Sequence, residues 1–381
     1  MNYCSRCIIP ITRPDQSFNK KNVCNACISF KNRKNINWEK RWSIFLDKIE
    51  KIKNLKRTGW NCVIPSSGGK DSTYQAIKAK ELGLNPILVT ATTCDLSDLG
   101  RENLENLKKM GFDTIEICPN LKTRAKLNKI CQKEIGDISW PEHVSIFTVP
   151  INFAIKSKIP LVLWGENPQM EYGGPKAELT NTTLNRKWME EFGGLLGLRV
   201  SDFVDNYGFT ENEMHIYKYL SIDELEDCKI ESLFMGFYEP WDSSRNLEVA
   251  KKNGFKTYKT TVENCFLDSE KLDNHQHGIH DYFKYLKYGF GRASDQLSVM
   301  IRKKMITRDE AIIEVQKFEG MFPNSYLGKD INDILEKIDL TKNEFIKICE
   351  KYTNKNIFKC NQAGELLKDG NGNLIKKLDY N

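Results

Sequence analysis

The sequence lacks any long apolar segment. A membrane-spanning helix needs about 18 consecutive apolar residues or more, and no such run occurs in this chain. The first residues, MNYCSRC, also lack the basic stretch and the following apolar stretch of an export signal. Because of these two absences, we expect neither a membrane partner nor secretion, and we predict a cytoplasmic protein.

The sequence also lacks a strong charge of either sign. Lys and Arg total 57 against 51 Asp and Glu, so the formal charge of +6 is small for 381 residues. Such a balance is compatible with anionic small molecules as ligands, and nucleic acid is not expected as a partner. With 40% hydrophobic and 28% charged residues, the composition is that of a globular chain with room for two or three domains.

Cysteine, by contrast, is plentiful, with twelve residues. A disulfide framework is typical of short secreted chains, which neither the length nor the N-terminus supports. Four of the cysteines form two chelating pairs, Cys4 with Cys7 and Cys24 with Cys27. Four thiolates close a tetrahedral shell around Zn²⁺ and leave no position for a substrate, which predicts a structural zinc ribbon. An iron–sulfur site and a redox pair are the alternatives.

Short apolar runs alternate with amphipathic helical segments through the middle of the chain. The strands are expected at 60–65, 85–93, 113–119, 159–165 and 231–240. This alternation predicts an α/β fold with a doubly wound parallel sheet. We divide the chain into a zinc ribbon (1–36), a connecting helix (37–58), an α/β domain (59–260) and a mostly helical C-terminal region (261–381).

A glycine-containing loop, PSSGGKDS (65–72), lies between the first expected strand and a helix. Gly68 and Gly69 let backbone N–H groups approach oxyanions without a Cβ in the way, and the helix presents its positive end there. Asp71 is hard to place beside phosphates unless it caps the helix or engages Mg²⁺. An ordinary glycine turn is the alternative. The phosphate-binding residues predicted are Ser66, Ser67, Gly68, Gly69, Lys70, Asp71 and Ser72.

Residues 67–72, SGGKDS, match the SGGxDS loop of the N-type ATP pyrophosphatases, and the chain resembles that superfamily. The resemblance implies that ATP is cleaved between its α and β phosphates. It also implies that the loop holds the departing pyrophosphate, with Mg²⁺, while AMP passes to an oxygen of the substrate. Lys70 and Asp71 are therefore expected to take part in catalysis.

Longer motifs narrow the resemblance. The cysteine pairs, LWGENPQMEYGG (163–174), YGFGRASDQLS (288–298) and ITRDEAI (306–312) are together similar to bacterial N-acetyl sugar amidotransferases, over nearly the whole chain. That family serves surface-polysaccharide and nonulosonic acid pathways. The resemblance implies that an acetamido group becomes an acetamidino group, on an N-acetylated acidic or nucleotide-linked sugar of lipopolysaccharide, capsule or flagellin-glycan biosynthesis.

Further site residues are expected on loops at the carboxyl ends of the strands. Glu166 and Asn167 are candidates to orient the amide or to accept protons from ammonia. Arg245 and Arg292 suit an anionic group of the substrate or of ATP. Candidates to shape the sugar pocket are Tyr172, Gly173 and Gly174. A plain loop, turn or surface ion pair is the alternative for each of these residues.

The sequence offers no obvious source of ammonia. Residue 2 is Asn rather than a cysteine nucleophile, and no segment supplies an obvious Cys/His/Glu glutaminase module. The family resemblance implies a separate glutaminase and a channel subunit like the pair used in histidine biosynthesis. The three neighbouring histidines, His275, His277 and His280, lack the spacing of a metal site, and we assign them no metal.

Two other functions share some of these features. A tRNA-thiolating or other tRNA-modifying enzyme would carry the same loop and zinc-bound cysteine pairs, and would need a reactive cysteine, for which Cys94 is the candidate. The second alternative function is that of a zinc-ribbon interaction module fused to an inactive nucleotide-binding fold. The intact SGGKDS loop argues against the inactive fold.

Overall fold

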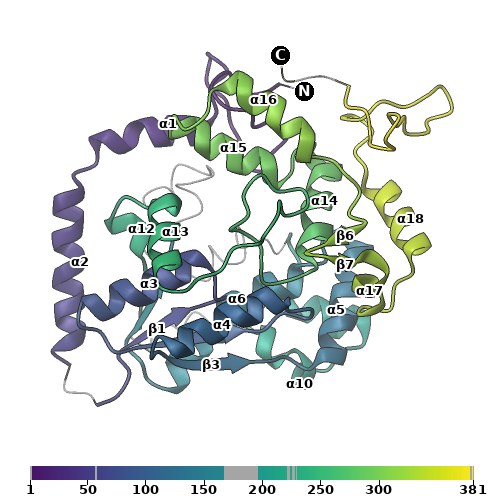
Figure 1. Cartoon of the computed structure of the whole chain (residues 1–381). Coiled ribbons are helices and arrows are strands. Elements are labelled where there is room, and N and C mark those ends of the chain that lie inside the picture. The colour runs from purple at the N-terminus through teal and green to yellow at the C-terminus, as the bar shows by residue number, and fades with distance from the viewer. Residues whose placement is uncertain are drawn as a thin grey trace.

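A central parallel sheet organises the chain (Figure 1). The computed structural model describes residues 2–55, 58–166, 196–220, 224, 228, 230–377 and 380. The strands are β1 (Cys62–Pro65), β2 (Pro86–Ala91), β3 (Asp113–Ile117), β4 (Leu161–Trp164) and β5 (Glu231–Phe234). Their order is β3-β2-β1-β4-β5, and every neighbouring pair is parallel. The chain thus builds outward from β1 in both directions, which confirms the predicted doubly wound sheet.

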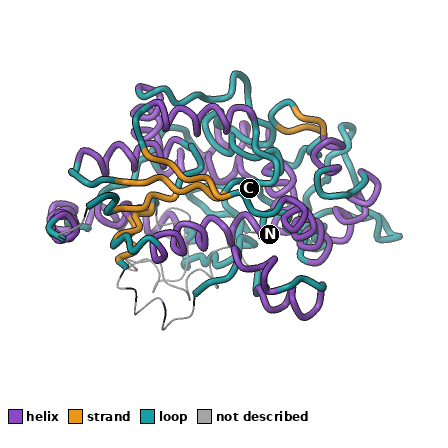
Figure 2. Tube along the Cα trace, turned by 90° about the horizontal axis from the view of Figure 1, so that it is seen from below, coloured by secondary structure: helices purple, strands orange, loops and turns teal. Residues whose placement is uncertain are grey.

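Helices cover both faces of the sheet (Figure 2). Ile64 packs with α2 (Trp38–Lys53) and α3 (Lys70–Glu81), whereas its neighbour Val63 packs against α6 (Trp140–Lys156) on the opposite face. Successive strand residues point to opposite faces, and here both faces are covered. This explains why the strands read as unbroken apolar runs instead of alternating with polar residues.

One predicted strand is too long. The expectation was 231–240, but β5 ends at Phe234 and α12 (Met235–Tyr238) begins at the next residue. The neighbouring strand β4 ends at Trp164, so the chain beyond Phe234 has no partner strand to pair with. Gly236 N–H instead donates to the carbonyl of Gly165 at 2.9 Å, which turns the backbone out of the sheet.

The remaining elements surround this core. On the α/β side they are α4 (Asp98–Lys109), α5 (Leu121–Glu134), α9 (Val200–Tyr207), α10 (Glu211–Met214), η3 (His215–Tyr217) and α13 (Ser243–Lys252). After residue 261 they are α14 (His277–Tyr288), α15 (Arg292–Arg302), α16 (Arg308–Phe318), β6 (Ser325–Tyr326), β7 (Lys329–Asp330), α17 (Ile331–Glu336) and α18 (Lys342–Tyr352). Within the described ranges, no helix combines the length and apolarity needed to cross a bilayer.

The N-terminal segment lies beside two helices of the C-terminal region, α15 and α16, and not beside the sheet. It contains α1 (Asn25–Asn32) and η1 (Arg33–Asn35), and it packs on α15 and α16. Tyr3 shares a buried apolar cluster with Leu297, and its ring lies 4.5 Å from that of Tyr380, measured between centroids. The two ends of the chain therefore meet, as Figure 1 shows.

Candidate active site

A cavity of about 780 Å³ opens at the carboxyl ends of the strands. The loops that follow β1, β4 and β5 line one side of it, and residues 267–273 with α15 line another. In open parallel sheets this edge is the place where ligands bind. The cavity therefore has the position of an active site.

The predicted phosphate loop lies in this cavity, and all seven of its residues line it. Gly68 has a left-handed backbone (φ +77°), and a Cβ added there would come within 3.0 Å of Leu104 N. Gly68 N–H donates to Ser66 Oγ at 3.2 Å, and Ser66 Oγ lies 3.1 Å from Ser72 Oγ. The α3 helix begins directly after Gly69, so its positive end faces the cavity. Phosphate binding by this loop stays a prediction, but the geometry suits it.

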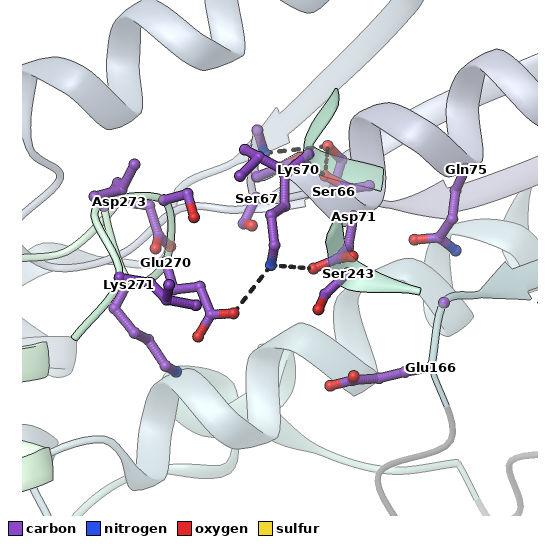
Figure 3. Close-up of a pocket in the computed structure, with 18 of the residues that line it drawn as sticks. Ser66, Ser67, Lys70, Asp71, Gln75, Glu166, Ser243, Glu270, Lys271 and Asp273 are labelled. Atoms are coloured by element: carbon purple, nitrogen blue, oxygen red, sulfur yellow. Dashed lines mark hydrogen bonds and ion pairs between the residues drawn. The ribbon is translucent and has the colours of Figure 1, made fainter. Parts of the chain in front are cut away.

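A group of charged side chains around the buried Lys70 lies beside the loop (Figure 3). Lys70 is only 7% exposed, and its Nζ donates to Asp71 Oδ2 at 2.7 Å and to Glu270 Oε1 at 3.3 Å. Burial alone would lower the pKa of Lys70, but Glu270 and Asp71 hold that pKa above its usual value. Burial would likewise raise the pKa of Glu270, yet Lys70 and a hydrogen bond from Gln296 bring it to about 2. Lys70 and Glu270 are therefore both charged at neutral pH.

Three members of this group were not predicted from the sequence. Glu270 precedes α14, Gln296 lies on α15, and Asn246 lies on α13, where its Nδ2 donates to Asp71 Oδ1 at 2.8 Å. The motif YGFGRASDQLS contains Gln296, so a signal for that residue existed. Nothing in the local sequence singles out Glu270, which meets Lys70 across 200 positions.

The same group suits a divalent cation. The carboxylates of Asp71 and Glu270 both contact the Lys70 ammonium, so they lie near each other. Carboxylate oxygens are ligands that Mg²⁺ prefers. Glu166, the residue two positions after β4, lines the cavity across from Asp71 (Figure 3). Its carboxylate also helps to raise the pKa of Lys70, after the larger effects of burial, Glu270 and Asp71. Asn167, Tyr172, Gly173 and Gly174 lie outside the described residues.

The two predicted arginines lie in different places. Arg292, the first residue of α15, lines the cavity, and its Nη2 lies 3.3 Å from Asp281 Oδ1. Arg245 is not among the described lining residues. Its guanidinium lies 4.5 Å from the centre of the Tyr74 ring and pairs with Glu239 at 3.3 Å. The structure thus brings Arg292 to the site and does not bring Arg245 there.

A second wall of the cavity comes from α6. Its Glu142 is paired with the buried Arg124 at 2.8 Å. Its His143 has an Nδ1 atom without a hydrogen-bond partner among the described residues, and burial lowers the pKa of His143 to about 3. The neighbouring His280 contacts Asp137 at 2.8 Å between Nδ1 and Oδ1. Because that pKa is so low, His143 is neutral at physiological pH.

The histidines singled out in the sequence do not share a common ligand position. His275 contacts Asp95, His277 contacts Asp273, and His280 contacts Asp137. Among groups of three or more His, Cys, Asp or Glu side chains within the described ranges, only the four N-terminal cysteines lie close enough together to hold a metal ion.

The four N-terminal cysteines do converge. Their Sγ atoms all lie within 4.8 Å of one another and are buried, with 3.7 Å between Cys7 and Cys24 and 4.0 Å between Cys4 and Cys27. Tetrahedral zinc with Zn–S bonds of about 2.3 Å places its sulfurs roughly 3.8 Å apart, so the spacing fits this ion. Backbone N–H groups of Cys24 and Cys27 also donate to sulfur, at 3.3 Å in each case. The cluster is therefore compatible with the predicted structural zinc.

Comparison with known proteins gives one family match. Residues 252–370 match the family described as LPS biosynthesis protein WbpG-like, C-terminal domain. This segment contains Glu270, Arg292 and Gln296, so it supplies one side of the cavity. Among proteins of curated function, none matches the chain.

Two solved structures are distantly similar. NMN synthetase from Francisella tularensis shares 13% identity, with a TM-score of 0.28, over 59% of this chain and 99% of that one. The NH3-dependent NAD synthetase from Campylobacter jejuni subsp. jejuni NCTC 11168, in complex with the nitrate ion, shares 18% identity, with a TM-score of 0.28, over 57% and 93%. Similarity at this level does not extend to the reaction.

Proposed function

We propose that this protein is an ATP-dependent amidotransferase that converts an acetamido group of an N-acetylated bacterial sugar into an acetamidino group. The observation that carries the proposal is the SGGKDS loop, which lines a cavity together with the Lys70, Asp71 and Glu270 charges. The match of residues 252–370 to a lipopolysaccharide biosynthesis family supports a sugar of surface polysaccharide as the substrate.

The reaction consists of two substitutions. The amide oxygen attacks the α-phosphorus of ATP, its bond to phosphorus forms, and pyrophosphate leaves with the electrons of the broken P–O bond. Ammonia then adds to the amide carbon, loses a proton, and expels AMP together with the former amide oxygen. The products are the amidine, AMP and pyrophosphate. Adenylation is needed because an amide oxygen is otherwise a poor leaving group.

The chain's own residues suit these steps. The backbone N–H groups at Gly68 and Gly69 and the start of α3 can hold the pyrophosphate. Asp71 and Glu270 can hold Mg²⁺, which neutralises phosphate charge when bound. Glu166 lines the opposite side of the cavity, and we propose that it accepts a proton from the attacking ammonia. Ammonia is proposed to come from separate glutaminase and channel subunits.

The tRNA-thiolating alternative is less well supported by the structure. Such an enzyme needs a reactive cysteine at the site. Cys94 is not among the described lining residues, and burial raises its pKa to about 12. A thiol with that pKa is almost entirely protonated at neutral pH and is a poor nucleophile.

A product assay tests the proposal. The protein is incubated with ATP, Mg²⁺, ammonium chloride and a panel of N-acetylated nucleotide sugars and nonulosonic acids, and the products are read by mass spectrometry. We expect an amidine that forms in step with AMP and requires both the sugar and ammonium. Asp71→Asn should abolish both products, whereas Asp47→Asn, on the exposed side of α2, should not. Turnover retained by Asp71→Asn, or AMP that forms only with tRNA, would contradict the proposal.

A further inference from the structure

Lys271 is a cation of the cavity that forms no direct ion pair within the described residues. It lines the cavity next to Glu270, and its side chain extends into the cavity (Figure 3). Its Nζ has no ion pair within 4.0 Å and no hydrogen bond in the part of the chain that the structure describes. The other lysines and arginines that line the cavity are paired: Lys70 with Asp71 and Glu270, Arg292 with Asp281, and Lys303 with Asp242.

An unpaired ammonium in such a place is unfavourable by itself. Burial and then the nearby Arg292 guanidinium lower the pKa of Lys271 from its ordinary value. The carboxylates of Asp281, Asp273 and Glu270 raise it, but they offset only a part of this effect. Lys271 is half-buried, and removing an ammonium partly from water without a direct partner costs free energy. A negatively charged ligand would remove this cost.

The backbone holds Lys271 in a fixed and unfavourable conformation. Its φ is +58°, in the left-handed region that costs a residue with a Cβ about 1–2 kcal/mol. Two hydrogen bonds hold the segment, one at Lys271 itself and one at the next residue. Tyr326 Oη donates to the carbonyl of Lys271 at 3.1 Å, and Ser97 Oγ donates to the carbonyl of Leu272. Strain that is held in place by neighbours in this way is typical of functional sites.

Lys271 faces a different part of the cavity from the phosphate loop. In Figure 3 the Glu270 carboxylate lies between the side chains of Lys70 and Lys271. Glu270 is already bound to Lys70 and Gln296, so it separates the two ammonium groups electrostatically. An anion on Lys271 is therefore a group other than the phosphates that the loop would hold.

We propose that Lys271 binds an anionic group of the acetamido substrate and thereby selects charged N-acetyl sugars over neutral ones. The anion is either the carboxylate of an acidic sugar or the diphosphate of a nucleotide-linked sugar, because both present the oxygens that an ammonium pairs with. The nature of the sugar rests on the proposed function, whereas the anion site itself rests on the geometry of Lys271.

Binding measurements with three variants test this site. Lys271→Gln removes the charge, and Lys271→Arg keeps it. Lys304→Gln is the matched control, because Lys304 has the same left-handed backbone (φ +60°) but is exposed and outside the described lining of the cavity. Calorimetry is done with the phosphate loop filled by the α,β-methylene analogue of ATP. The probes are N-acetylglucosamine, UDP-N-acetylglucosamine, N-acetylneuraminic acid and UDP-N-acetylglucosaminuronic acid.

We expect Lys271→Gln to weaken the binding of the anionic probes by about tenfold or more, the loss of one charge-assisted contact. Lys271→Arg should restore most of the affinity, Lys304→Gln should bind as the unchanged protein does, and the neutral probe should not respond. If Lys271→Gln loses affinity for both UDP sugars, the anionic group that Lys271 binds is the diphosphate. If it loses affinity only for the two acidic sugars, that group is the carboxylate.

Three results would overturn the inference. They are unchanged binding of every anionic probe in Lys271→Gln, a loss confined to the ATP analogue when that analogue is titrated alone, and no preference of the unchanged protein for anionic over neutral probes. The product assay distinguishes a failure of the anion site from a failure of the proposed reaction. If Lys271→Gln formed the amidine as well as the unchanged protein does, the proposed anion site would be wrong and the proposed reaction would stand. If the anionic probes bound in a Lys271-dependent way but no amidine formed, the anion site would stand and the proposed reaction would be wrong.

Discussion

Replacing Glu270 with glutamine would remove one of the two carboxylates that neutralise the buried Lys70 ammonium. The pKa of Glu270 falls from 4.5 to about 2, because Lys70 and Gln296 outweigh the effect of burial. A shift of this size corresponds to a stabilisation on the order of 3 kcal/mol at neutral pH. The side chain is 20% exposed, so solvent screening removes only a part of it. We expect Glu270→Gln to lower the free energy of unfolding by about 2–3 kcal/mol at pH 7.

The pH dependence of this loss has a definite sign. The pKa of Glu270 is lower in the folded chain than the value of 4.5 for the unfolded chain, so its stabilisation is complete above pH 4.5 and declines as the pH falls toward 2. The difference between the original protein and Glu270→Gln should therefore be largest at neutral pH. It should shrink to about half near pH 3.

Urea unfolding at several pH values, followed by circular dichroism, measures this difference. Glu314→Gln is the control, because Glu314 forms an exposed ion pair with Lys317 one turn away and should cost less than about 0.5 kcal/mol. If Glu270→Gln unfolded at the same urea concentration as the original protein at pH 7, the pairing of Glu270 with Lys70 would not stabilise the fold. A loss that does not change with pH would show that packing, and not charge, is responsible.

Three further predictions concern the metal cluster, a buried histidine and the glycine loop. The purified chain should contain about one zinc ion by atomic absorption, and Cys24→Ser should lose it and unfold at a lower temperature, since three thiolates leave the shell open; full zinc retention would contradict this. His143 has a pKa of about 3 when folded against 6.5 when unfolded, so its contribution is complete above pH 6.5 and is lost as the pH falls. In urea titrations, the free energy of unfolding of the original protein should therefore fall between pH 7 and pH 5 by about 2 kcal/mol more than that of His143→Gln. Equal decreases in the two proteins would refute the lowered pKa of His143. Gly68→Ala should cost about 1–2 kcal/mol and weaken ATP binding in calorimetry, whereas Gly59→Ala, equally left-handed (φ +86°) but facing open space among the described residues, should leave ATP binding unchanged.

The parts of the fold that could be predicted from the sequence are those that depend on residues adjacent in the sequence. A strand such as β2 appears as a short apolar run, and the loop at Gly68 and Gly69 is recognisable from six consecutive letters. The strand expected at 231–240 was too long, because its end is set by where β4 stops, and that is not visible in the strand's own residues.

The parts of the site that the sequence missed depend on contacts across the chain. Glu270 resembles many exposed acids in sequence, and only its ion pair with Lys70 shows its importance. Arg245 follows a strand, as a ligand-binding residue would, but Glu239 and Tyr74 hold it outside the described lining of the cavity. Lys271 adopts a left-handed backbone that its residue type does not favour, so nothing in the local sequence singles it out.

The position of the cysteine ribbon has a consequence for the order in which the chain folds on the ribosome. Thr12 Oγ1 donates to the carbonyl of Tyr288 at 2.6 Å, a contact between residues 276 positions apart. The ribbon is synthesised long before the helices that it packs on, and its apolar side stays exposed until α15 and α16 have emerged. An ion bound early would keep the four thiolates together through this interval, and would protect them from oxidation while the rest of the protein is being made.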